Sequence, residues 1–248
     1  MTTRKKAALI AAGLLVVFLG VARAAKLSRY RHYMAQHRVH AQPAPAEHQH
    51  DAEIVQSMSG EHMHPEAHMR WSTLRPALPA DQQRAVQIVE TLRGSLDKYK
   101  DYHAAIADGY EPFFPNAPQR MVHFTNNWQG FLGAFRFDPA QPTSLLYKKT
   151  PGGYELIGAM YTAPRGMAEE KLDARVPLSV ARWHQHVNIC LPPRGKGSSA
   201  DWTVFGPAGS IATREECSEA GGRFYPQVFG WMVHVYPFEQ TPEKIWTH

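Results

Sequence analysis

Between Asp81 and Ala107 the apolar residues recur at alternating intervals of four and three, the spacing of one face of an α-helix. Gly109 follows, and glycine commonly ends a helix. The pattern therefore predicts one amphipathic helix over 81–107 that packs on the elements after it. His103 falls on this stripe, either as a hydrogen-bonded core histidine or as a metal ligand. The stripe consists of Ala85, Val89, Leu92, Leu96, Tyr99, His103 and Ile106.

From about residue 119 the hydrophobic period shortens towards two, the period of a strand with one buried face. The segment "KKTPGGYE" carries a Pro-Gly-Gly turn and predicts a hairpin. One helix followed by strands indicates an α+β fold, with a mostly antiparallel sheet or partial barrel packed by the long helix. Long connections are expected at 163–178 and 191–222. The expected strands are 119–125, 143–149, 154–162, 181–190 and 229–237.

The net charge of +5 is concentrated at the N-terminus. Residues 1–31 hold seven basic residues and no acid, so the remaining chain, with 20 basic and 22 acidic residues, carries about −2. This distribution argues against a nucleic-acid groove. The cluster Arg4-Lys5-Lys6 precedes a 16-residue apolar run, 7–22. That length lies between a signal-peptide core and a membrane span.

The domain organisation follows from these patterns. Residues 1–25 are expected to be a signal peptide or a single membrane anchor, with a buried core helix as the alternative. The positive-inside rule then places the rest of the chain outside the cytoplasm, in the periplasm, either secreted or held at the cytoplasmic membrane. Residues 26–78 are expected to form a tether, and residues 79–248 a globular α+β domain.

The tether is rich in histidine and methionine. Residues 26–75 hold eight of the fourteen histidines, and their densest part is "EHMHPEAHM", 61–69. Imidazole and thioether together suit copper, whereas zinc has little use for methionine. The alternative is a polar tether in which histidine is incidental. The candidate ligands of this segment are His62, His64, His68, Met63 and Met69.

Three of the expected strands carry histidine on the polar side of a regular alternation. In "RWHQHVNIC", 182–190, His184 and His186 project to the same side, opposite Trp183 and the apolar residues. "RMVHFTN" offers His123, and "FGWMVHVYP" offers His234. These four histidines are the candidate metal ligands. The alternative is a polar barrel interior in which they only form hydrogen bonds.

Spacing separates the cysteine from this site. Cys190 lies four residues beyond His186, about 13 Å along a regular strand, which is too far for one ion with bonds of about 2 Å. Outside the cytoplasm two cysteines are expected to form a disulfide. We therefore expect Cys190 to pair with Cys217, and Asn188 at most to support a ligand.

The segments "GYEPFFP", "VHFTN", "FDPAQPTSLLYKK", "GYELIGAMY" and "WHQHVNIC" resemble a poorly characterised family of exported bacterial proteins over about residues 109–237. The resemblance implies that His123 and His186 belong to a shared site with Met160 near it. More distant members vary at the position of His184 and often have glutamate at that of Met160. Methionine there favours copper and weakens any hydrolytic role. The family has no established activity.

Three functions fit these features. The first is an exported, membrane-tethered binding protein for a transition metal, copper before zinc, held by the strand histidines. The second is a mononuclear metal enzyme, a hydrolase or oxidoreductase that acts on a small periplasmic substrate. The third is an envelope protein whose histidines serve structure or pH sensing. No nucleophile elbow, phosphate loop or dinucleotide fingerprint is present in the sequence. The protein partner and any substrate stay open.

Overall fold

The computed structural model describes residues 65–113 and 121–247. Their elements alternate short helices with the strands of one sheet, and no described helix is long and apolar enough to cross a membrane. In chain order the elements are α3 (Pro65–His68), β1 (Met69–Trp71), α4 (Pro79–Leu96), η1 (Asp97–Lys100), α5 (Tyr102–Ala107), β2 (Glu111–Pro112), β3 (Met121–Thr125), α6 (Asn127–Phe135), β4 (Ser144–Thr150), β5 (Gly153–Ala163), α7 (Glu169–Asp173), β6 (His184–Leu191), η2 (Gly197–Ser199), α8 (Arg214–Glu219), β7 (Arg223–Val235) and α9 (Pro242–Ile245).

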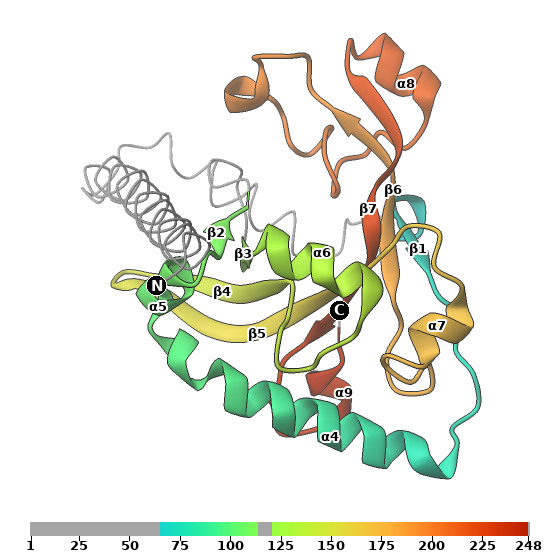
Figure 1. Cartoon of the computed structure of the whole chain (residues 1–248). Coiled ribbons are helices and arrows are strands. Elements are labelled where there is room, and N and C mark those ends of the chain that lie inside the picture. Colours follow the sequence, from blue (N-terminus) through green and yellow to red (C-terminus); the bar gives the residue numbers. More distant parts are fainter. Residues whose placement is uncertain (1–64, 114–120, 248) are drawn as a thin grey trace, which may run out of the picture.

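The strands form one antiparallel sheet in the order β1-β6-β7-β5-β4-β3-β2. The expected α+β architecture is confirmed, and the sheet is open rather than closed into a barrel. β4 and β5 form the predicted hairpin and then curve together across the centre of the molecule (Figure 1). The curl brings Phe113, after β2, against Phe229 of β7, with ring centroids 5.5 Å apart.

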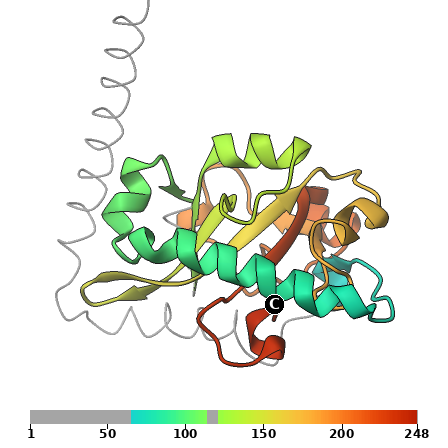
Figure 2. The ribbon, with the colours of Figure 1, turned by 60° about the horizontal axis from the view of Figure 1, so that its bottom comes forward.

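One face of the sheet, which we call the core face, packs against α4, η1 and α5 (Figure 2). The helix stripe is apolar because the helix must bury one side against the strands, and Ile88, Leu92 and Leu96 are fully buried there. Asp81 accepts a hydrogen bond from the Leu78 amide and so caps the start of α4. The sheet contributes Val122, Phe124, Leu145, Tyr147, Ala159, Tyr161, Val233 and Val235 to this core.

The prediction of one continuous helix over 81–107 is wrong. The segment divides into α4, η1 and α5, because Asp101 has an extended backbone and its side chain accepts the amide of His103 to begin a new helix. The break shifts the helical phase, so Tyr102 is buried and His103 is exposed. His103 is therefore not a core histidine.

The folded domain begins earlier than the expected residue 79. β1 is an edge strand of the sheet, and Arg75 forms ion pairs with Asp81 and Asp173. The long connections also contain short helices, α7 in one and α8 in the other. β7 begins at Arg223, six residues before its predicted start, and α6 was not predicted.

The predicted disulfide between Cys190 and Cys217 is present. It joins β6 to α8 within a lobe that extends beyond the rest of the sheet (Figure 1). Val204, Phe205 and Ile211 pack around the two sulfurs, and the amide of Gly206 donates to the Cys190 carbonyl. The disulfide thus fixes the loop that precedes α8.

Candidate metal centre

The face of the sheet opposite the core face carries several methionines and histidines. We call it the concave face. Alternation along each strand places these side chains there, because their neighbours belong to the core face. Leu146, Met160 and Met232 form its buried centre, with Met121 and Tyr236 packed beside them.

Two of the predicted histidines meet across this face. The Nε2 atoms of His123 on β3 and His234 on β7 lie 3.5 Å apart, although β4 and β5 separate their strands. The curl of the sheet produces this contact. Two nitrogens that share a tetrahedral zinc-like ion with bonds of about 2.0 Å lie about 3.3 Å apart, so the observed spacing matches a pair of metal ligands.

His184 and His186 continue the group on β6. The ring centroid of His184 lies 5.2 Å from that of His234 and 5.5 Å from that of His186. A register shift between His184 and His186, opposite Phe229 with its positive φ of 62°, lets β7 follow β6 past this point. The four predicted histidines therefore form a row from β3 to β6.

Burial keeps the two ends of the row neutral. Burial first, and the nearby His186 second, lower the pKa of His123 to about 4. Burial first, and the nearby His68 second, lower the pKa of His186 to about 4. A neutral imidazole has a free lone pair, so protons do not compete for these two ligands near pH 7.

Methionine thioethers lie beside the pair formed by His123 and His234. Met160 is the cross-strand neighbour of His234, and such neighbours have Cβ atoms about 5 Å apart. Met232 is in turn the neighbour of His184. The hydroxyl of Tyr236 donates to the sulfur of Met121 at 3.5 Å, so that sulfur already has a partner. Met160 and Met232 are thus the thioethers placed beside the row.

The last two residues of the His/Met-rich stretch 61–69, His68 and Met69, lie beside the row. His68 is buried and its Nε2 hydrogen-bonds to the Gly209 carbonyl at 2.7 Å, while Met69 pairs with His186. Asn188 donates to the Ala67 carbonyl and holds α3 on β6. This hydrogen bond positions the backbone beside His68, and the predicted support of a metal ligand by Asn188 stays a prediction. The candidates His62, His64 and Met63 lie outside the described residues.

Over 65–113 and 121–247, no three or more His, Cys, Asp or Glu side chains are gathered in a form that would hold an ion. The histidines lie in a row rather than around one point. His103 is remote from the row, since it hydrogen-bonds Asp101 and stacks on Tyr102.

A hollow of about 280 Å³ adjoins the row at His184 and His234. Trp71, Trp246 and Arg182 line it, and the Arg182 guanidinium lies 5.0 Å from the Trp71 ring centroid. Sequence patterns did not indicate this hollow, because β1 has only three residues and Trp246 follows the last strand. The aromatic residues Trp183, Tyr161 and Tyr236 are not among its lining residues.

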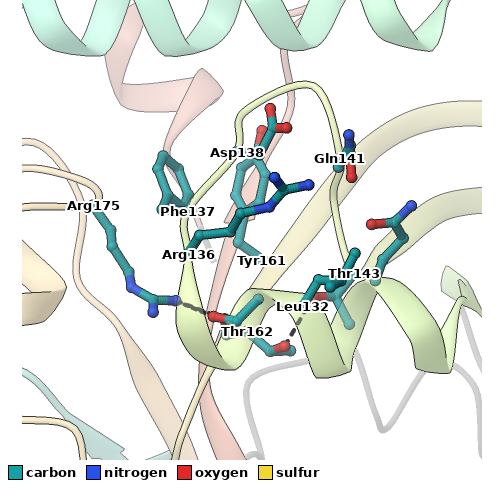
Figure 3. A pocket seen from close by; sticks show the side chains of 11 residues that line it. Leu132, Arg136, Phe137, Asp138, Gln141, Thr143, Tyr161, Thr162 and Arg175 are labelled. Atoms are coloured by element: carbon teal, nitrogen blue, oxygen red, sulfur yellow. Dashed lines mark hydrogen bonds between the residues drawn. The ribbon is translucent and has the colours of Figure 1, made fainter.

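A second hollow lies beneath α6 and is too small for a ligand (Figure 3). Its volume of about 10 Å³ has room for about one water molecule. Arg175 donates there to the carbonyls of Gly133, Ala134 and Thr162, and burial lowers its pKa. This arginine satisfies the C-terminal carbonyls of α6 and serves the fold.

Comparisons of the chain with protein-family models, with curated proteins and with solved structures each found no match. Function must therefore be argued from the row of histidines and its thioethers.

Proposed function

We propose that the protein binds a soft transition-metal ion, Cu(I) before Zn(II), on its concave face between His123 and His234, with Met160 as the third ligand. The observation that carries the proposal is the 3.5 Å separation of the two Nε2 atoms beside a buried thioether. Two imidazoles and a thioether form a ligand set that favours Cu(I).

The surroundings favour binding over catalysis by a hard metal. The pair lies among methionines, and the one buried carboxylate of the described residues, Asp81, lies in α4 and pairs with Arg75. Nearby imidazoles are neutral, so a monovalent cation meets no repulsion from protonated ligands at pH 7. The Cys190–Cys217 disulfide supports a site outside the cytoplasm, which agrees with the expected N-terminal anchor or signal.

The test is metal titration of the full chain, in a background where the seven histidines from His32 to His64 are replaced by asparagine. This background removes the histidines of the tether. Cu(I) affinity is measured by competition with a chromogenic chelator without oxygen. We expect His123→Ala and His234→Ala each to weaken binding by at least about 100-fold, because each removes one of only two imidazoles.

Met160→Leu separates copper from zinc. Leucine keeps the volume but removes the thioether, so Cu(I) affinity should fall about tenfold while Zn(II) affinity changes little. His103→Ala is the matched control, since this exposed histidine lies outside the row. Unchanged Cu(I) affinity in the His123→Ala, His234→Ala double variant would refute the proposal and leave the structural or pH-sensing role.

A second candidate function is a mononuclear metal enzyme, favoured by the hollow beside His184 and His234. A metal at the row would face this space, and Arg182 and the two tryptophans suit a small anionic or aromatic substrate. Azide added to the protein loaded with Cu(II) tests it. A spectral change that Arg182→Ala weakens would support an open coordination position, and no change would favour pure binding.

A further inference from the structure

The last turn of the His/Met-rich segment is fixed against the sheet at three points. Met69 pairs with His186, the Asn188 side chain donates to the Ala67 carbonyl at 3.0 Å, and His68 hydrogen-bonds to the Gly209 carbonyl. The segment thus ends in a defined position on β6, where its histidine and methionine are both buried.

The hydrogen bond of His68 determines its tautomer. A carbonyl oxygen only accepts, so Nε2 must carry the hydrogen, and Nδ1 of the neutral ring carries the lone pair. This Nδ1 is buried and has no hydrogen-bond partner among the described residues. A buried acceptor without a partner costs about 1–3 kcal/mol. The lone pair is therefore placed for a ligand.

His186 presents a second such atom close by. Its Nδ1 is also buried without a hydrogen-bond partner in the described part of the chain. His68 directly precedes Met69, the residue that pairs with His186, so its side chain starts from the backbone beside that pair. Met69, directly across from His186, projects to the same face and brings a thioether to the pair.

The row of rings connects this place to the centre of the concave face. From His186 the next centroid, that of His184, lies 5.5 Å away, followed by His234 at 5.2 Å and His123 at 5.6 Å. Each step is short enough for small side-chain movements to bring neighbouring rings to one ion. The row explains why no compact group of three ligands exists in the described residues.

We propose that His68, Met69 and His186 form a second soft-metal site, the edge site, which receives Cu(I) first and passes it along His184 to His123 and His234. The transfer step rests on the proposed function, whereas the edge site stands without it. Each step is a ligand exchange: a bond from copper to one imidazole or thioether forms as another breaks. Copper stays monovalent, and no proton or electron is transferred.

The first experiment counts ions, with Cu(I) alone as the probe and the full chain in the asparagine-substituted tether background. We expect two Cu(I) per chain. His68→Gln keeps a side-chain amide to donate to Gly209 and removes the Nδ1 ligand, and Met69→Leu keeps the volume and removes the sulfur. Either variant should retain one tight ion, while His103→Ala should retain two.

The second experiment follows loading by stopped flow. His68→Gln should slow the filling of the central site at least about tenfold and leave its equilibrium affinity unchanged, which a general loss of structure would not do. Two retained ions and an unchanged rate in the His68→Gln, Met69→Leu double variant would overturn the edge site. If the edge ion persists after His123→Ala and His234→Ala abolish the central one, both sites stand. If those substitutions change nothing while His68→Gln removes an ion, the central site fails and the edge site stands.

Discussion

The two faces of the sheet treat polar groups differently. On the core face three tyrosine hydroxyls each donate to a main-chain carbonyl: Tyr110 to Pro142, Tyr147 to Tyr99 and Tyr161 to Pro139. On the concave side, the Nδ1 atoms of His68 and His186 have no such partner within the described residues.

Two indole nitrogens, those of Trp183 and Trp231, also lack hydrogen-bond partners in the described structure. An indole N–H can only donate and cannot bind a metal ion, whereas imidazole offers a lone pair. The feature particular to the concave side is therefore the imidazole lone pair. The core face thus leaves two indole donors without partners in the described structure, whereas the concave side leaves imidazole lone pairs, which suits the proposed metal site.

The largest expected effect is a loss of folding stability that leaves metal binding unchanged. Leu92→Ala removes a fully buried side chain of α4 from the core and should lower the free energy of unfolding by about 2–5 kcal/mol, with metal stoichiometry unchanged. Met160→Leu on the opposite face should cost less than about 1.5 kcal/mol and weaken Cu(I) binding. Urea unfolding and chelator competition measure the two quantities. A Leu92→Ala protein that folds but loses its metal would show that the faces are coupled.

The sequence predicts which residues lie on each face of the sheet better than it predicts which of their side chains contact one another. Alternation correctly assigns Val122 and Phe124 to the core face and His123 to the other, because strand period is a local property. The contact of His123 with His234 depends on strand order and on the curl of the sheet, which no local pattern contains. α6 escaped prediction because glycines 130 and 133 face the sheet while Trp128, Phe131 and Phe135 are exposed, the reverse of an ordinary surface helix.

The concave side also depends on the disulfide. Replacing Cys190 and Cys217 by serine opens a loop with a sequence separation of 27 residues, and should cost about 3–4 kcal/mol on a chain-entropy estimate. The same loop carries Gly209, whose carbonyl holds His68, so loading through the edge site should slow. Chemical unfolding and stopped-flow loading with and without reductant test this. Equal loading rates would show that Gly209 is positioned without the disulfide.

The smallest expected effect concerns the core face and alkaline pH. Burial first, and the nearby Tyr99 second, raise the pKa of Tyr147 above its usual value near 10, so the folded state keeps this hydroxyl protonated. The resulting stability is present below pH 10 and is lost as pH rises above it, because the unfolded chain then releases the proton more readily. Tyr147→Phe removes the hydrogen bond to the Tyr99 carbonyl and should cost about 1 kcal/mol at pH 7.

Above pH 10 the phenylalanine variant loses no such proton, so its deficit relative to the parent protein should shrink. Urea unfolding at pH 7, 9 and 10.5 measures the deficit at each pH. A deficit that stays constant to pH 10.5 would mean that Tyr147 ionises as easily in the folded state as in the unfolded chain. The core face would then tolerate charge beside its carbonyls, and the contrast with the concave face would rest on the imidazole lone pairs alone.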